Sequence, residues 1–144
     1  MNILFATLAY HPDDIRDVAA ASRDGLQNQI QTFQWSLIQG IRENLNQGET
    51  LSILNALPVG VFPCHYRKLI LHSKIRSDSF QEIGCLDLPW FKQRQRMMRA
   101  EKAMEKWIKA SPENRTILVY TVYLPYLEAV TAVKRRHPEV QTCV

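Results

Sequence analysis

The chain has 144 residues, of which 46% are hydrophobic and 22% are charged, and it contains 5 glycines. This length and composition exclude disordered and fibrous proteins and fit one globular domain around a single hydrophobic core. Lys and Arg outnumber Asp and Glu by 18 to 14, and the resulting net charge of +4 is too small for a dedicated nucleic-acid-binding protein, so we expect no nucleic-acid partner.

The first apolar run covers residues 3–8. Because it is nearly unbroken, it is typical of a strand that is buried on both faces of a parallel sheet, and we expect it to be the central strand. No basic segment precedes it, and it is too short for a signal peptide or a membrane-spanning helix. We therefore expect a cytoplasmic protein.

A long polar segment, residues 9–25, follows this strand. It has no clear periodic pattern, whereas strand-to-helix connections commonly take about two to six residues. We predict a loop at the edge of the sheet where α/β proteins bind ligands, and two interpretations stay open: a ligand-binding loop or a solvated surface loop. Gly25 is a single glycine and does not form the G-x-G-x-x-G pattern of a dinucleotide-binding turn.

Apolar residues recur every three or four positions over residues 26–45, which predicts a long amphipathic helix. Residues 51–57 predict a second strand, which ends at Pro58 and Gly60. Farther along, residues 69–71 and 83–88 are short strand candidates, one of them at an edge of the sheet. The polar stretch 74–82 between them has no apolar period of its own.

Pro89 suits the start of a helix that extends to Ala110. We expect its core side to contain Met97, Met98, Met104, Trp107 and Ile108. We expect its polar side to contain Lys92, Arg94, Arg96, Arg99, Lys102, Lys106 and Lys109. The favoured interpretation of the segment from Trp90 to Lys109 is a solvated basic face over a core contact, and the alternative is peripheral contact with the inner face of an anionic membrane.

The last third of the chain continues the alternation of strands and helices. Residues 116–122 form a second β-branched apolar run, typical of a buried parallel strand. A helix follows from Leu124 to about His137, and residues 140–144 begin another strand. We predict an α/β domain over residues 1–144, with a Rossmann-like parallel sheet flanked by helices, truncated at its C-terminal end.

Seven segments resemble the opening part of bacterial family 4 glycosyltransferases, in the same order along the chain. They are residues 2–8 (NILFATL), 24–29 (DGLQNQ), 32–40 (TFQWSLIQG), 56–60 (ALPVG), 82–89 (EIGCLDLP), 117–121 (ILVYT) and 124–127 (LPYL). The order and spacing of these segments, rather than any single motif, identify the resemblance. It spans nearly the whole chain.

The resemblance implies the GT-B architecture, in which two Rossmann-like domains face a cleft. The first domain holds chiefly the acceptor, and the second binds the nucleotide-sugar donor. Residues 1–144 would then be the acceptor-side domain, and the donor-binding domain would lie beyond Val144. The implied reaction transfers a hexosyl group from a nucleotide sugar to a glycan or lipid-linked acceptor, usually with retained anomeric configuration and without a metal or other cofactor.

In this reaction negative charge builds on the departing diphosphate, and preorganised cations and backbone donors stabilise it inside a closed cleft. The resemblance implies that these groups lie mainly in the second domain, so we expect this chain to be inactive alone. The rival hypothesis is a non-catalytic α/β module that binds a sugar or a nucleotide without turning it over.

Position at the strand ends, together with the resemblance, indicates a set of substrate-binding residues. They are Asp24, Gly25, Gln27 and Asn28 at the start of the first helix, and Thr121 and Tyr123 after the later buried strand. His11, in the polar segment, is the candidate for proton handling. Two departures from the family bear on these roles: many members have a histidine where Val122 and Tyr123 stand, and many have a paired-glycine turn where only Gly25 stands.

Each candidate has a structural alternative. Asp24 is equally well placed to cap the N-terminus of the helix. Gln27 and Asn28 fit exposed first-turn residues, Tyr123 fits a packed aromatic with a hydrogen-bonded hydroxyl, and Thr121 fits an ordinary strand residue.

No metal site is predicted. Cys64, Cys85 and Cys143 are odd in number and widely spaced, which favours reduced, mostly buried thiols over a disulfide framework or a zinc site. His65 and His72 lack a helical partner at metal-ligand spacing and are interpreted as structural histidines.

Overall fold

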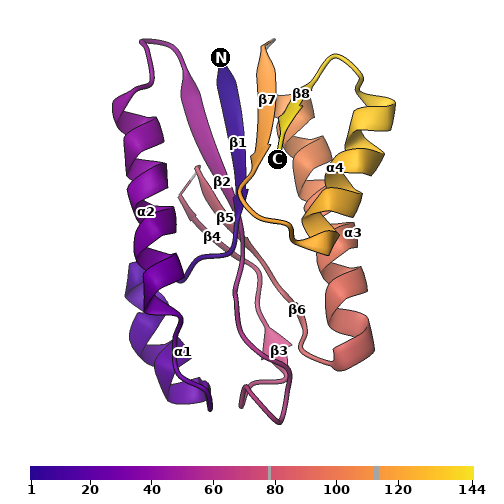
Figure 1. The fold of residues 1–144 in the computed structure, drawn as a ribbon. Helices are drawn as coiled ribbons and strands as arrows, with labels where there is room; N and C mark the ends of the chain where they lie inside the picture. Colours follow the sequence, from indigo (N-terminus) through magenta and orange to yellow (C-terminus); the bar gives the residue numbers. More distant parts are fainter. Residues whose placement is uncertain (78, 112–113) are drawn as a thin grey trace.

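The structure is a computed structural model that describes residues 1–77, 79–111 and 114–144. Its centre is a six-stranded sheet in the order β4-β5-β2-β1-β7-β8 (Figure 1). In that order the strands are β4 (Lys74–Ser77), β5 (Phe80–Ile83), β2 (Thr50–Ala56), β1 (Asn2–Thr7), β7 (Arg115–Val119) and β8 (Gln141–Cys143). All neighbours are parallel except β4, which runs antiparallel to β5 at one edge. The α/β class and the mostly parallel sheet predicted from the sequence are confirmed.

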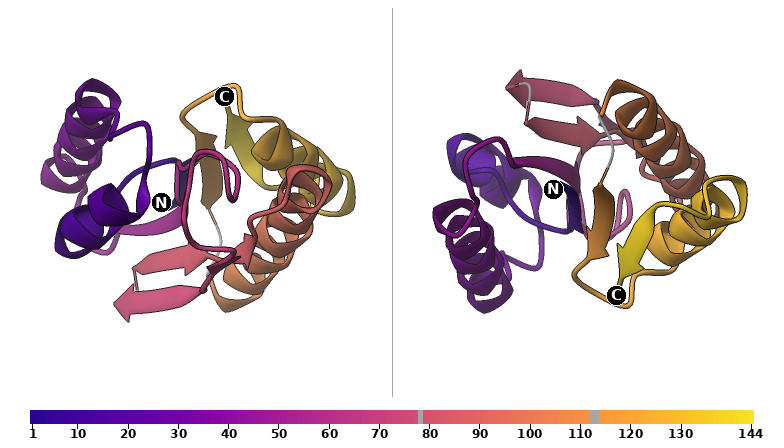
Figure 2. Two further views of the ribbon diagram at one scale, coloured as in Figure 1. Left: turned by 90° about the horizontal axis from the view of Figure 1, so that it is seen from below. Right: turned by 90° about the horizontal axis from the view of Figure 1, so that it is seen from above.

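Helices cover both faces of this sheet. The helices are α1 (Ile15–Ala21), α2 (Asn28–Glu43), α3 (Pro89–Ala110) and α4 (Leu124–Arg136). Figure 2 shows α1 and α2 together on one face and α3 and α4 together on the other. The result is a three-layer arrangement that is compatible with a Rossmann-like fold.

β1 is the central strand, as its unbroken apolar run predicts, and all six of its residues are buried. Alternate side chains enter the two halves of the core because a strand presents successive residues to opposite faces. Leu4 and Ala6 belong to the cluster that includes residues of α3 and α4, such as Met104 and Tyr126. Ile3 and Phe5 pack instead with residues of α2 and β2.

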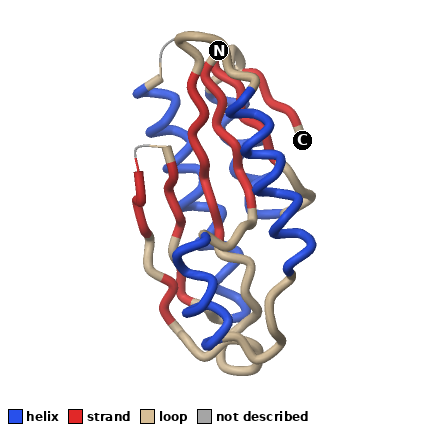
Figure 3. Tube along the Cα trace, turned by 90° about the vertical axis from the view of Figure 1, so that its left-hand side faces the viewer, coloured by secondary structure: helices blue, strands red, loops and turns tan. Residues whose placement is uncertain are grey.

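The prediction that residues 9–25 form a loop is wrong. This segment contains a turn of 3-10 helix at Pro12–Asp14 and then α1. The helix escaped detection because it is only seven residues long and buries just two of them, Val18 and Ala21, so it has no repeating apolar stripe. The connection after β1 is therefore an ordered unit, which lies beyond the carboxyl end of the sheet (Figure 3).

The middle of the chain also differs from expectation. The polar stretch 74–82 contains β4 and all of β5 except Ile83, and β5 pairs with β2 inside the main sheet. The strand candidates at 69–71 and 83–88 contribute β3 (Ile70–Leu71) and β6 (Cys85–Leu86), which pair with each other in a separate two-stranded sheet. The edge position that we expected for one of them belongs to β4. Sequence patterning fails here because strands of two to four residues are too short to show a period.

Two further expectations are corrected by burial. Lys92 and Arg96 of α3 are buried, although we expected them on its polar side, and Met98, expected in the core, is 49% exposed. Cys64 and Cys143 are exposed, so only Cys85 of the three thiols is buried. Across the described residues, none of the helices has the length and apolar character needed to cross a membrane.

Candidate functional site

The sheet order reverses direction beside β1, and this reversal locates the site. The chain runs from β1 to β2 and then to β5 in one direction, whereas β7 and β8 lie on the other side of β1. The helices that follow β1 and β7 consequently cover opposite faces, which leaves a crevice between the two strands at their carboxyl ends. Open α/β sheets bind their ligands at such a point.

A pocket of about 100 Å³ lies at this crevice, and we call it the switch-point pocket. Its lining comes from the segments after β1, β2 and β7 and from the beginning of α2. The lining residues are Leu8, Tyr10, Gln27, Gln31, Gln34, Pro58, Tyr120 and Thr121. Four segments that are distant in the sequence therefore meet at the edge where a ligand is expected.

Three side-chain amides hold the backbone that leaves β1. Gln34 accepts from the backbone N–H of Leu8 at 3.0 Å and donates to its carbonyl at 2.6 Å. Asn55 bonds the same two groups of Ala9, and Gln31 bonds the same two groups of Tyr10. Each amide supplies the hydrogen bonds that a neighbouring strand would otherwise make, so these backbone groups stay paired beyond the end of β1.

Tyr10 joins three of the lining segments. Its hydroxyl donates to the carbonyl of Pro58 at 2.8 Å and lies near the backbone of Gln27. Burial raises the pKa of this phenol, and the nearby backbone of Gln27 opposes the shift only in part. Tyr10 is therefore a neutral anchor that fixes the start of α2 against the segment after β2.

The segment after β2 is held from the other face by the two buried cations of α3. Lys92 Nζ donates to the carbonyls of Val59 and Gly60 at 2.6 and 2.9 Å. Arg96 Nη2 donates to the carbonyl of Leu57 at 2.5 Å. A buried cation is tolerated where carbonyls and a counter-ion replace water, which explains why these residues face inward.

The counter-ion of Lys92 is Asp87, whose Oδ1 lies 2.6 Å from Nζ. Both side chains are almost completely buried. Burial lowers the pKa of Lys92 and the nearby Arg96 guanidinium lowers it further, whereas Asp87 raises it. The pair belongs to the scaffold behind the pocket rather than to its lining.

The structure brings two of the predicted site residues together. Gln27 and Thr121 both line the switch-point pocket, at the beginning of α2 and after β7. Asn28 is the first residue of α2, is exposed and contributes its carbonyl to Thr32 Oγ1 at 3.0 Å. Asn28 is thus next to the pocket without being one of the described lining residues.

Tyr123 occupies the far side of the same edge. Its hydroxyl accepts from Arg96 Nη1 and donates to Gln93 Oε1, both at 2.9 Å. Burial raises the pKa of this phenol, and the charge of Arg96 opposes the shift. The contacts match the structural alternative for Tyr123, a packed aromatic with a hydrogen-bonded hydroxyl.

Asp24 and Gly25 lie in the turn between α1 and α2. The Asp24 carboxylate contacts the ring of His65 rather than the helix, and the N-cap position belongs to Gln27, so the interpretation of Asp24 as the N-cap is wrong. Gly25 has a φ of +78°, a conformation that favours glycine, and its carbonyl accepts from Ser22 Oγ at 3.0 Å. Both residues shape the entry into α2.

His11 packs away from the pocket. Its ring makes edge-on contacts with Trp35 and Phe80, at centroid distances of 5.9 and 5.0 Å. Burial lowers the pKa of this imidazole and the charge of Arg76 lowers it further, whereas Asp13 and Asp14 raise it. His11 is not among the described residues that line the switch-point pocket with Gln27 and Thr121.

Sequence patterning missed several residues of the site, including Tyr10, Gln31, Gln34, Pro58 and Tyr120. One signal was present: Gln34 is polar, yet it lies one helical turn before the buried Ile38 on the core side of α2, and it is 1% exposed. A polar residue within an apolar stripe indicates a buried hydrogen-bonding role. Gln31 lies in the same helix but gives no such signal, and Tyr10, Pro58 and Tyr120 come from irregular segments, which have no periodic pattern.

All described lining residues of the switch-point pocket are uncharged. They offer amides and hydroxyls, and Gln31 and Gln34 already use their amides to hold the backbone. Within the described residues, the side chains of Gln27, Tyr120 and Thr121 are the polar groups of the lining that form no hydrogen bond inside the chain and are left to contact a ligand. Such a lining can orient hydroxyl groups by hydrogen bonding, and it does not supply an acid or a base.

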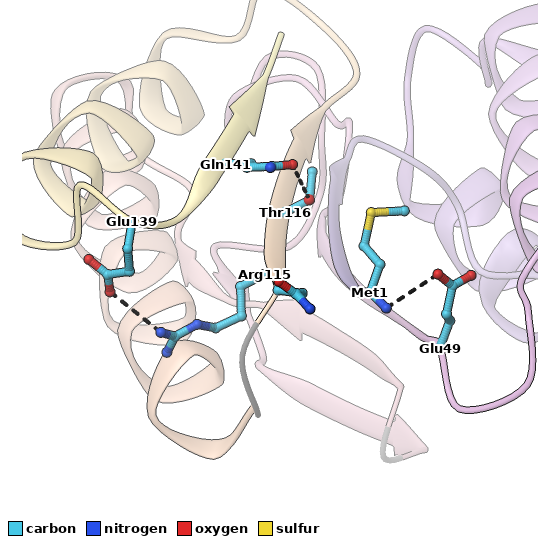
Figure 4. Close-up of a pocket in the computed structure, with 7 residues that line it drawn as sticks. Met1, Glu49, Arg115, Thr116, Glu139 and Gln141 are labelled. Carbon is cyan, nitrogen blue, oxygen red and sulfur yellow. Dashed lines mark hydrogen bonds and ion pairs between the residues drawn. The ribbon is translucent and has the colours of Figure 1, made fainter.

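A larger cavity, of about 620 Å³, lies at the opposite edge of the sheet, near the amino ends of the strands (Figure 4). Its charges are paired within the chain: the Met1 amine is 3.3 Å from Glu49, and Arg115 Nη2 is 3.4 Å from Glu139. Because ligands of parallel sheets bind at the carboxyl ends, we do not assign the site to this cavity. Within the described residues, His, Cys, Asp and Glu form no group of three or more suited to a metal ion.

Comparison of the chain with family models, with curated proteins and with solved structures finds no match. The site is therefore defined by its own geometry: a small uncharged pocket at the switch point of a mostly parallel sheet.

Proposed function

We propose that this chain is the acceptor-side domain of a nucleotide-sugar-dependent glycosyltransferase of the GT-B type. It would hold a hydroxyl-bearing glycan or lipid-linked acceptor at the carboxyl edge of its sheet. The nucleotide-sugar donor would be bound by a second domain that is not among these 144 residues. On this proposal the chain binds one substrate and catalyses no transfer by itself.

The observation that carries the proposal is the convergence of Gln27 and Thr121 on one pocket at the switch point. Both residues were predicted from their positions beyond the ends of the buried strands, and the resemblance to family 4 glycosyltransferases adds support for Gln27. The uncharged lining suits sugar hydroxyls, which need hydrogen-bond donors and acceptors in fixed positions. The backbone beneath the pocket is fixed by Gln31, Gln34 and Asn55, so the site is preorganised.

The uncharged lining also supports the assignment of the acceptor to this domain and of the donor to a second domain. Stabilising a departing diphosphate requires cations or aligned backbone donors. In the switch-point pocket the described side chains are neutral, and the cations behind it, Lys92 and Arg96, are occupied by carbonyls and by Asp87. Donor chemistry therefore fits a partner domain better than this one.

The binding half of the proposal is tested by nuclear magnetic resonance on the ¹⁵N-labelled chain. Titration with mono- and oligosaccharides is expected to shift the amide signals of Gln27 and Thr121 more than those of residues at the amino edge, such as Glu49 and Arg115. Nucleoside diphosphates are the comparison ligands. Strong shifts at the pocket with nucleotides alone, and none with sugars, would overturn the acceptor assignment.

The catalytic half is tested with the complete gene product that contains this chain. Incubation with a panel of nucleotide sugars and candidate acceptors is expected to release nucleoside diphosphate only when an acceptor is present. The 144-residue chain alone serves as the inactive control. Sugar binding without any turnover by the complete product would favour the rival hypothesis of a non-catalytic binding module.

A further inference from the structure

The solvent-facing side of α3 carries a concentration of positive charge, and we call it the α3 outer face. Its exposed cations are Arg94, Arg99, Lys102, Lys106 and Lys109. They extend along a helix of 22 residues, which corresponds to a length of about 33 Å. Five of the 18 Lys and Arg residues of the chain therefore lie on this one face.

The two acidic residues of α3, Glu101 and Glu105, do not neutralise the charge of this face, because both form ion pairs with residues at the end of α4. Arg136 of α4 binds Glu101 at 2.6 Å and Glu105 at 2.9 Å, and His137 lies 3.0 Å from Glu105. The other two cations of α3, Lys92 and Arg96, are buried behind the pocket. In the part of the chain that the structure describes, no acidic side chain forms an ion pair with the five exposed cations.

Large apolar side chains accompany these cations. On the α3 outer face, Phe91 and Met98 lie two helical turns apart and are 58% and 49% exposed. Trp90, at the start of the helix, is 90% exposed. Exposing aromatic side chains to water is unfavourable, and their combination with Lys and Arg is typical of helices that lie at a membrane interface.

The start of α4 extends the apolar part of this surface. The Tyr123 hydroxyl bonds Gln93 and Arg96, so α4 begins against the turn of α3 that follows Trp90. Val122 and Leu124, on either side of Tyr123, are 86% and 61% exposed. Val122 and Leu124 therefore add exposed apolar side chains near the first turns of α3.

We propose that the α3 outer face, together with the exposed apolar side chains at the starts of α3 and α4 (Trp90, Val122 and Leu124), binds the surface of an anionic lipid bilayer. The cations contact lipid headgroups, and the apolar side chains insert at the level of the acyl boundary. The positive charge of this face is complementary to an anionic bilayer. A nucleic acid fits less well, because Trp90 and Phe91 lie on a helix and not on a sheet surface where bases could stack on them. This inference does not depend on the proposed glycosyl transfer.

Sedimentation with lipid vesicles tests the proposal on the chain itself. We expect binding to vesicles of phosphatidylcholine containing phosphatidylglycerol, and much weaker binding to phosphatidylcholine alone. Binding should fall as NaCl is added, because screening shortens from about 10 Å at 0.1 M to about 3 Å at 1 M salt. Of the three tryptophans Trp90 is the exposed one, so its fluorescence should shift to the blue on binding, and W90F should abolish that shift.

A charge variant and its matched control locate the surface. R94Q/K102Q/K106Q is expected to weaken partitioning roughly 100-fold, at about fivefold for each basic residue near the bilayer. The control R16Q/R23Q/R42Q removes the same charge from exposed positions on or beside α1 and α2, which cover the other face of the sheet, and should bind like the original chain. Circular dichroism of both variants verifies that they are folded.

Three results would overturn the proposal. The first is equal binding to neutral and anionic vesicles, or none to either. The second is equal weakening by the two triple variants, which would indicate a response to total charge. The third is binding of single- or double-stranded RNA tighter than binding to anionic vesicles at the same salt, with the same loss in R94Q/K102Q/K106Q, which would assign the face to nucleic acid.

Discussion

The side chain of Asn55 binds both backbone groups of Ala9: the N–H of Ala9 donates to Asn55 Oδ1 at 2.7 Å, and Asn55 Nδ2 donates to the Ala9 carbonyl at 2.9 Å. Asn55 lies at the carboxyl end of β2, and Ala9 follows β1, with which β2 is paired in parallel. The amide thus continues the sheet by side chain after the strand ladder has ended. It also donates to Glu82 Oε2 at 3.0 Å, which ties β5 into the same edge.

Replacing Asn55 with alanine is expected to lower the free energy of unfolding by about 2–4 kcal/mol, because buried partners on Ala9 and Glu82 lose their hydrogen bonds. Urea unfolding measures this change. The exposed turn residue Gln47 gives the control, and Q47A should change stability by less than about 0.5 kcal/mol. A loss in N55A no larger than that in Q47A would contradict the role of the amide.

Glu82 should make stability depend on pH in a specific direction. Burial raises the pKa of this carboxyl above its usual value of 4.5, and the bond from Asn55 opposes the shift only in part. The folded state therefore holds the proton more tightly than the unfolded state does. The contribution of Glu82 is most favourable below the unfolded pKa and is lost as pH rises through the folded pKa.

E82Q removes this titration, so the difference in unfolding free energy, E82Q minus the original chain, should increase as pH rises from 4.5 to neutrality. Urea titrations at several pH values measure the difference. Taking the difference cancels the contributions of other carboxyls, such as Asp14. Burial raises the pKa of Asp14, but its contacts with Arg76 and Lys74 have the larger effect, so that its pKa is lowered overall. A difference that stays constant with pH would show that Glu82 titrates as in the unfolded chain.

The buried pair of Lys92 and Asp87 is expected to be costly to break from one side. K92M leaves the Asp87 carboxylate buried without its counter-ion and should destabilise the fold by about 3–5 kcal/mol. In D87L/K92M no charge is left behind, and much of that loss should be recovered. A double-mutant cycle by urea unfolding measures the coupling free energy between Lys92 and Asp87. If the stability losses of K92M and D87L simply add up in D87L/K92M, the two residues are not coupled.

Thr121 and Gln27 should affect ligand binding without affecting stability. T121V and Q27A each remove one hydrogen-bonding group from the switch-point pocket and are expected to weaken sugar binding about threefold to tenfold. Calorimetric or magnetic-resonance titration measures the dissociation constant. T131V is the matched control, because the Thr131 hydroxyl bonds only the Leu127 carbonyl within α4, at 2.7 Å. If T131V weakens binding as much as T121V does, the pocket is not the site.

Hydrophobic patterning predicted the long elements well. The central strand, α2, α3 and α4 each bury a stripe or run of apolar residues that repeats often enough to be recognised. Short elements were missed for the converse reason. α1 buries two residues and β4 none, so neither leaves a period in the sequence.

The composition of the candidate pocket was only partly predicted from the sequence. The rule that ligands bind beyond the carboxyl ends of parallel strands indicates this edge of the sheet, and of the predicted residues Gln27 and Thr121 line its pocket. Asp24 and His11 were included because they are polar and lie in the same segment. The fold pairs Asp24 with His65 and packs the ring of His11 edge-on against Trp35 and Phe80.

The sequence by itself determined the fold class, because apolar periodicity is a local property that each helix and buried strand carries within its own residues. Only the tertiary structure decided that Lys92 and Arg96 face inward, that amides of Gln31, Gln34 and Asn55 complete the end of β1, and which cations of α3 stay exposed. These outcomes depend on carbonyls and carboxylates contributed by distant segments. The sequence shows that a side chain is polar, but tertiary packing determines which group it contacts.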